Sequence, residues 1–226
     1  MVSGNEKAQT ISPSEAILIV IASFFLMLFA AAFTDWVGYG ITILLGELLL
    51  IALPLGYMLL KNIDVKSYIG LQLNSRKILL GVVIGFLLIF FEVIVNSALV
   101  SVLGESEAVR QSNQTILEMS RSTEGLILMT ASLVLAGICE EFTFRGFLQT
   151  SISSRFPVWV AIATSSLVFG LFHLDLQGVY TLSAFLLGLV LGYVYHHWRS
   201  YTVSATAHAT LNLLVLALLV LMPSSV

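Results

Sequence analysis

The sequence predicts an all-α fold, a polytopic transmembrane helical bundle of about seven spans. Apolar residues make up 58% of the 226 residues, and charged residues only 10%. A soluble protein carries about 25% charged residues, so this chain has too few polar groups to cover a soluble fold. The apolar residues also gather into segments long enough to cross a bilayer. We therefore expect an integral, multi-pass membrane protein.

A transmembrane helix needs about 20 mostly apolar residues. Polar or turn-forming stretches separate the apolar segments at residues 35–40, 61–77, 104–125, 151–157 and 175–178. The predicted spans are residues 16–33, 41–60, 78–103, 126–150, 158–173, 179–195 and 203–222. The fourth is longer than a span needs, and the fifth and sixth are short. The count is seven, or eight if one span is misjudged.

The predicted domain organisation is simple. Residues 1–15 form a polar N-terminal tail, and residues 16–226 form a single transmembrane helical domain. With the N-terminus inside, the cytoplasmic segments hold eight of the ten Lys and Arg residues. The positive-inside rule therefore predicts a cytoplasmic N-terminus, and we expect a bacterial plasma membrane.

The net charge and the cysteine content exclude one class of partner and one kind of cross-link. The net charge is −3 and no basic stretch stands out, so we expect no nucleic-acid partner. Cys139 is the single cysteine, so the chain has no internal disulfide. The composition itself predicts one partner, the lipid bilayer.

Ionisable side chains inside the spans indicate a structural or functional role, because each costs at least ~2.5–3.5 kcal/mol at mid-bilayer. Glu141 and Arg145 are four residues apart, so they share one helix face and can pair. Adjacent Glu140 points about 100° away and has no local partner. A desolvated carboxylate of this kind suits a general base. Taken alone, the Glu141–Arg145 pair is better explained as a structural ion pair than as a group that takes part in chemistry.

Two further pairs have the same four-residue spacing, Phe169 with His173 and His208 with Asn212. An antiparallel hairpin turning near Pro157 would place Glu140 and His173 at nearly equal depth. Its tip, residues 149–155, would then project into the cytoplasm. Any one of these side chains could be explained by helix packing. Taken together, they predict a shared functional site a short way below the cytoplasmic surface.

The other polar residues and the glycines within the spans do not indicate a specific chemical role. Glu47 and Glu92 are expected to be structural, with Asn96 as a local partner for Glu92, and their roles stay open. Four glycines are expected to allow close helix packing. They are Gly137, Gly170, Gly188 and Gly192.

The three motifs together resemble the CPBP family of intramembrane proteases, which includes type II CAAX prenyl proteases and bacteriocin-processing, Abi-like proteins. The family pattern is Glu-Glu-x-x-x-Arg, then Phe-x-x-x-His, then His-x-x-x-Asn. All three stand in order here, and the resemblance covers a motif-bearing core of residues 126–221.

The resemblance implies an intramembrane endopeptidase. Glu140 and His173 would activate a water, and His208 and Asn212 would stabilise the oxyanion. Glu141, Arg145 and Phe169 would support the site. Substrates of the family include prenylated CAAX proteins and maturing or bacteriocin peptides.

Three alternatives stay open. The first is a zinc-dependent form of the protease, with the metal on Glu140, His173 and His208, although no cofactor is required by the favoured reading. The second is a non-catalytic adaptor or immunity protein of the same fold. The third is a proton- or ion-coupled transporter, against which the absence of an internal repeat argues.

Overall fold

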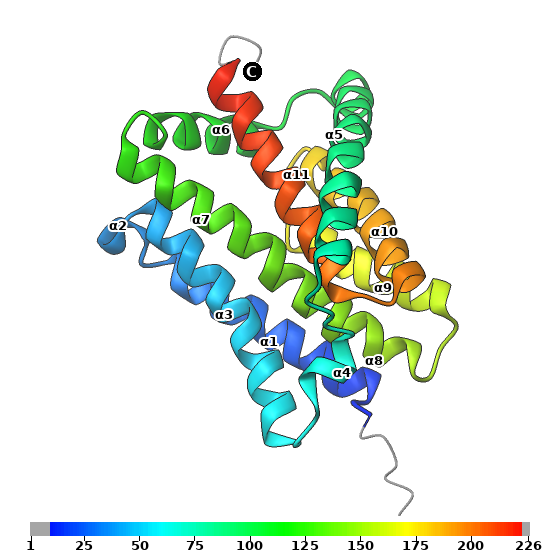
Figure 1. Cartoon of the computed structure of the whole chain (residues 1–226). Helices are drawn as coiled ribbons and strands as arrows, with labels where there is room; N and C mark the ends of the chain where they lie inside the picture. Colours follow the sequence, from blue (N-terminus) through cyan, green and yellow to red (C-terminus); the bar gives the residue numbers. More distant parts are fainter. Residues whose placement is uncertain (1–9, 223–226) are drawn as a thin grey trace, which may run out of the picture.

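The structure is a computed structural model that describes residues 10–222, and within this range every regular element is a helix. Figure 1 shows the elements packed as one bundle. In chain order they are α1 Pro13–Ala31, α2 Thr34–Val37, α3 Tyr39–Leu60, α4 Val65–Ile69, α5 Ser75–Leu103, α6 Glu107–Met119, α7 Thr123–Glu140, the π-helix η1 Glu141–Gln149, α8 Thr150–Ser153, α9 Val158–Leu171, α10 Val179–Trp198 and α11 Tyr201–Leu221.

Six helical segments of the described chain are long and apolar enough to cross a membrane. They are α1, α3, α5, the continuous segment Thr123–Ser153, α10 and α11. Helix α9 is apolar but only 14 residues long. This arrangement confirms the predicted all-α bundle of about seven spans, including the long fourth segment and the short fifth one.

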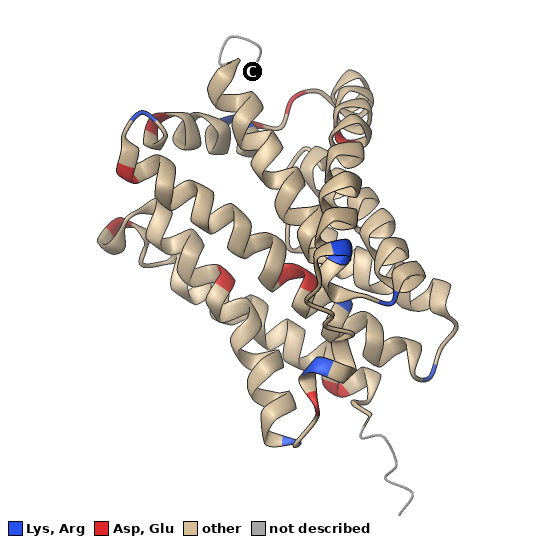
Figure 2. Ribbon diagram, viewed as in Figure 1, with Lys and Arg blue, Asp and Glu red and all other residues tan. Residues whose placement is uncertain are grey.

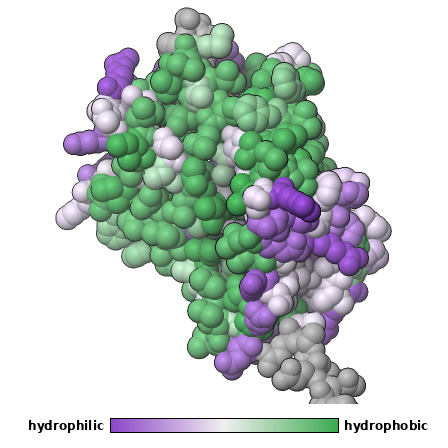
Figure 3. All heavy atoms as spheres, viewed as in Figure 1, coloured by the Kyte–Doolittle hydropathy of each residue, from purple (hydrophilic) through white to green (hydrophobic). Residues whose placement is uncertain are grey.

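The outer surface of the bundle suits lipid. Phe25 and Phe29 on α1 are 63% and 66% exposed, and Phe90 and Ile94 on α5 are 67% and 69% exposed. Figure 3 shows a broad apolar surface with hydrophilic groups gathered toward the ends. Such large exposed rings would destabilise a soluble protein, whereas in a bilayer they face hydrocarbon.

Basic residues gather at the end of the bundle where α1 begins (Figure 2). Lys61 lies 3.8 Å from Glu15 of α1, and Lys77 Nζ donates to the Trp198 carbonyl. At the same end, the Gln72 amide donates to the Arg199 carbonyl. This clustering agrees with the expected placement of the basic residues on one side. Part of the predicted N-terminal tail, residues 1–9, lies outside the described residues.

The connecting stretches contain structure that the apolar pattern did not predict. Residues 104–125 were expected only to separate two spans, but they contain α6, an amphipathic helix with Ser106 as its N-cap. The Tyr39 hydroxyl at the start of α3 lies 3.3 Å from Ser112 Oγ. Helix α6 therefore lies at the end of the bundle opposite to the basic cluster.

The predicted hairpin tip is shorter than expected. Gln149 is 3% exposed and its side-chain amide donates to the Gly192 carbonyl. Ser151 is also buried and its hydroxyl donates to the Ile11 carbonyl. The first residues of the predicted tip thus pack against α10 and the start of α1, and the turn itself follows α8.

Close packing between α7 and α11 depends on Gly137, as predicted. A Cβ atom at Gly137 would lie 2.5 Å from the Ala209 nitrogen. Gly170 similarly approaches the Thr181 carbonyl, at 2.9 Å from the corresponding Cβ position. These contacts hold the helices that carry the three motifs at short distances from one another.

Candidate active site

The Glu-Glu-x-x-x-Arg motif lies where α7 continues into the π-helix η1. Glu140 is the last residue of α7, and Glu141 and Arg145 lie in η1. All nine residues of η1 are buried. π-helical turns are rare and occur often at functional sites. Here the π-helix places a whole turn of motif residues inside the bundle.

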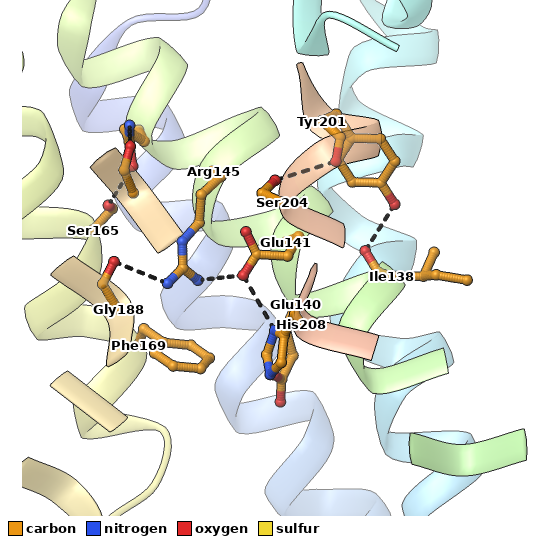
Figure 4. Close-up of polar contacts among 12 residues, drawn as sticks. Ile138, Glu140, Glu141, Arg145, Ser165, Phe169, Gly188, Tyr201, Ser204 and His208 are labelled. Atoms are coloured by element: carbon orange, nitrogen blue, oxygen red, sulfur yellow. Dashed lines mark hydrogen bonds and ion pairs between the residues drawn. The ribbon is translucent and has the colours of Figure 1, made fainter. Parts of the chain in front are cut away.

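Arg145 is fully buried and joins three elements (Figure 4). Its Nη1 atom lies 3.0 Å from Glu141 Oε1, and its Nη2 atom donates to the Gly188 carbonyl of α10 at 3.2 Å. Its guanidinium carbon lies 4.5 Å from the centre of the Phe169 ring. The predicted pairing of Glu141 and Arg145 is confirmed, and Phe169 adds a cation–π contact to it.

His208 lies between the two motif glutamates. Its Nδ1 atom lies 3.2 Å from Glu141 Oε1, and its Nε2 atom lies 3.5 Å from Glu140 Oε2. A carboxylate beside Arg145 only accepts hydrogen bonds, so Nδ1 of His208 carries a proton and donates it to Glu141. The Nε2 atom is left facing Glu140.

His173 approaches Glu140 from the end of α9. Its Nε2 atom lies 3.7 Å from Glu140 Oε1. Its Nδ1 atom lies 2.9 Å from the Phe169 carbonyl oxygen, which only accepts, so Nδ1 carries the proton. In the tautomer that this bond selects, the Nε2 atom carries the lone pair and faces Glu140. The predicted hairpin, with Glu140 and His173 at equal depth, is confirmed.

Two aromatic rings fix the plane of His173. The Phe169 ring centre lies 4.6 Å from the imidazole centre, and the Tyr180 ring centre lies 4.9 Å from it at an interplanar angle of 88°. Phe169 also touches His208, with ring centres 5.9 Å apart. Phe169 thus contacts both imidazoles and Arg145, which explains its place in the motif.

Asn212 is placed one turn beyond His208 on α11, and its side-chain nitrogen donates to the Leu133 carbonyl of α7 at 3.2 Å. This bond ties α11 to α7. An amide nitrogen has two hydrogens, so one remains for another acceptor.

Glu140 and His173 are partly exposed, whereas the ion pair beside them is fully buried. The side chains of Glu140 and His173 are 12% and 15% exposed, whereas those of Glu141 and Arg145 are 0% exposed. A substrate can therefore meet Glu140 and His173 while the ion pair behind them stays dry.

Metal binding was the open alternative for Glu140, His173 and His208. Within residues 10–222, no group of three or more His, Cys, Asp or Glu side chains is arranged to hold a metal ion. Zinc binding also requires that each ligand atom lies about 2.0–2.2 Å from one common point, the position of the metal.

Sequence reasoning missed two contributors to the site. Tyr180 is an uncharged aromatic at the start of a predicted span, and nothing in its spacing marks it. The Gly188 carbonyl accepts from Arg145, but a backbone acceptor has no sequence signature. The Asp175 carboxylate, two residues after His173, binds the Thr181 amide and stabilises the loop instead of touching the imidazole.

Comparison with known proteins gives one family match. The family described as Rce1-like, type II CAAX prenyl endopeptidase Rce1-like, matches residues 122–214. This segment runs from the start of α7 into α11 and contains all three motifs. No match was found among curated proteins or among solved structures.

Proposed function

We propose that this chain is an intramembrane protease of the CPBP type that hydrolyses a peptide bond of a CAAX-type or other membrane-associated peptide substrate, because residues 122–214 match the Rce1-like family. The observation that carries the proposal is the position of Glu140, with the Nε2 atoms of His173 and His208 at 3.7 and 3.5 Å. These distances are too long for good direct hydrogen bonds and leave the polar atoms available to a water and a substrate.

In the proposed reaction, Glu140 takes a proton from a water that His173 also holds through its Nε2 lone pair. The water oxygen forms a bond to the scissile carbonyl carbon, and the carbonyl oxygen becomes an oxyanion. Glu140 then passes the proton to the leaving nitrogen as the carbon–nitrogen bond breaks. A carboxylate in this role contributes typically 10²–10⁴-fold.

His208 is proposed to stabilise the oxyanion. Because its Nδ1 proton is given to Glu141, its Nε2 atom can donate only when the ring is an imidazolium. Asn212 is proposed to donate its remaining amide hydrogen, and each such donor is worth about 3–4 kcal/mol in known oxyanion holes.

The test is cleavage of a fluorogenic peptide library, with and without a prenyl group, by detergent-purified protein. Glu140→Ala and Glu140→Gln should each lose at least about 10²-fold in kcat. Glu124→Gln is the matched control, since Glu124 is an exposed acid in the first turn of the same helix. A strong chelator should leave the wild-type rate unchanged.

Two results would redirect the proposal. Loss of activity with the chelator, restored by zinc, would favour the zinc-dependent form. If the wild type and Glu140→Ala are equally inert on every peptide, the adaptor or immunity function is favoured.

A further inference from the structure

The end of the bundle where basic residues gather holds a cluster of cations that lies outside the candidate active site. Arg76 and Lys77 lie in the first turn of α5, and Arg199 directly follows α10. The Gln72 side-chain amide donates to the Arg199 carbonyl, and Lys77 Nζ donates to the Trp198 carbonyl at 3.2 Å. The start of α5 and the end of α10 therefore lie side by side, and together they carry three cations.

These three cations have no carboxylate partner among the described residues. The ion pairs that Lys and Arg form within residues 10–222 lie elsewhere, and they join Lys61 to Glu15, Arg110 to Glu107 and Arg145 to Glu141. Arg76 and Arg199 are exposed, and Lys77 has two ammonium hydrogens left after its bond to Trp198. The cluster therefore offers positive charge and hydrogen-bond donors to an anion from outside the chain.

The first turn of α5 is an unfavourable place for cations. The N-terminal end of a helix carries a partial positive charge, so a cation there costs stability and an anion gains it. Helices α1, α6 and α7 follow this rule, with Glu15, Glu107 and Glu124 in their first turns. The first turn of α5 has two basic residues and no acid. A bound anion would remove this penalty, because it would meet both the cations and the helix end.

The surface that continues from the cluster along α5 is apolar. Leu79, Val83 and Phe86 are 64%, 49% and 51% exposed. They follow Arg76 at spacings of three, seven and ten residues, so they lie on the same helix face. Figure 3 shows strongly hydrophilic atoms where α5 begins and apolar surface further along the helix. The cations therefore lie where the lipid-facing surface ends, which is the level of the lipid headgroups.

Aromatic rings line the α10 side of the cluster. The Tyr193 and His197 rings stack with their centres 5.6 Å apart, and the Trp198 ring meets His197 edge-on at 5.2 Å. Lys77 Nζ lies 5.5 Å from the centre of the Trp198 ring. Tyr and Trp are typical of the boundary between membrane and water, because each ring has an apolar body and a polar edge. This composition favours a lipid headgroup over a soluble anion.

We propose that the start of α5 and the end of α10 form a binding site for an anionic phospholipid. Arg76, Lys77 and Arg199 bind the phosphate, and an acyl chain lies along the apolar face of α5. Guanidinium groups bind phosphate oxygens through paired hydrogen bonds, and an ammonium group adds a point charge. Basic pockets between transmembrane helices bind acidic headgroups in this way. The inference does not rest on the proposed function, because lipid binding requires no peptide cleavage.

Equilibrium binding of phosphatidylglycerol and phosphatidylcholine to the detergent-purified protein tests the proposal. The wild type should bind phosphatidylglycerol at least about 10-fold more tightly than phosphatidylcholine. The double variant Arg76→Gln, Arg199→Gln should weaken phosphatidylglycerol binding about 25-fold, at about 5-fold for each cation, and leave phosphatidylcholine binding unchanged. The matched control is Lys66→Gln, Arg155→Gln, which removes two exposed cations from the same end of the bundle but outside the cluster (Figure 2).

Three outcomes of this experiment would overturn the proposal. Unchanged phosphatidylglycerol binding in Arg76→Gln, Arg199→Gln would show that the cluster does not hold the headgroup. An equal loss in the control variant would show a general attraction to the charged end instead of a site. Displacement of the lipid by an equal concentration of inorganic phosphate would show that the cluster takes a free anion.

Tryptophan fluorescence tests where the lipid binds. The chain has three Trp residues, and Trp36 and Trp159 are 88% and 71% exposed, so Phe can replace both and leave Trp198 alone. Phosphatidylglycerol with brominated acyl chains should quench Trp198 at a lower concentration than brominated phosphatidylcholine. This difference should disappear when Arg76→Gln and Arg199→Gln are added. Equal quenching by the two lipids in the protein with Trp198 alone would contradict the proposed site.

Discussion

His208 Nδ1 lies 3.2 Å from Glu141 Oε1, and this contact determines what the rest of the imidazole can do. Since the Nδ1 proton is committed to a buried carboxylate, the Nε2 atom donates only from the charged ring. Glu141 is itself held by Arg145 at 3.0 Å. In the proposed reaction, the buried ion pair therefore acts through His208, because Glu141 and Arg145 are 0% exposed.

Glu141→Gln should therefore lower kcat by about 10²–10³-fold with little change in KM. The amide oxygen still accepts from Nδ1, but that hydrogen bond loses the full negative charge of the carboxylate. The measurement is steady-state cleavage of a fluorogenic peptide, accompanied by a thermal unfolding curve. A kcat equal to that of the wild type in a folded variant would show that the charge of Glu141 has no part in catalysis.

Arg145→Met should destabilise the protein by about 3–5 kcal/mol, because it leaves the buried Glu141 carboxylate without its cation. The double variant Arg145→Met, Glu141→Leu should lose less than the sum of the two single changes, since it removes both charges together. Free energies of unfolding from denaturant titration in detergent check this prediction. Additive losses would mean that the two charges do not interact.

The sequence was sufficient to predict the spans and the meeting of Glu140 with His173. The spans follow from apolar runs that are long enough to cross a bilayer. The meeting follows because Glu140 and His173 lie at equal distances along the chain from one turn. The amphipathic helix α6 was not predicted, because its pattern lies within a polar stretch that a search for apolar spans treats as a connection.

Asn212 illustrates a different limit of sequence reasoning. Its spacing from His208 correctly places both side chains one turn apart on α11. The partner of its amide nitrogen, the Leu133 carbonyl, belongs to another helix and depends on how closely α7 and α11 approach. That approach depends in turn on Gly137, whose missing side chain makes room for the Ala209 backbone.

Gly137→Ala should reduce activity more than its single methyl group suggests. The new Cβ atom would lie 2.5 Å from the Ala209 nitrogen, so α7 and α11 must separate. Glu140 and His208 lie on these two helices, and a displacement of about 1 Å at a catalytic group can cost about 10²-fold. Gly56→Ala on α3 is the matched control, because a Cβ there meets nothing within 4 Å. Equal kcat values for the two variants would contradict this account.

The loop after His173 should give the protein a pH-dependent stability that Asp175 controls. Burial of Asp175 raises its pKa, but hydrogen bonds from the Thr181 amide and nearby groups outweigh burial, and the pKa of Asp175 lies below its ordinary value. Because the folded state has the lower pKa, the Asp175 carboxylate stabilises the loop at pH values above its ordinary pKa. This contribution is lost as the pH falls through the lowered value.

Asp175→Asn should therefore lower the melting temperature at neutral pH, and the difference from the wild type should shrink between about pH 5 and pH 3. Thermal unfolding of both proteins across this range checks the prediction, with Asp35→Asn in the distant short helix α2 as the control, because Asp35 is exposed. A difference that stays constant over the whole range would mean that the Asp175 charge does not stabilise the loop. Because the Thr181 hydroxyl lies 3.1 Å from the His173 carbonyl, the same loosening should also lower kcat.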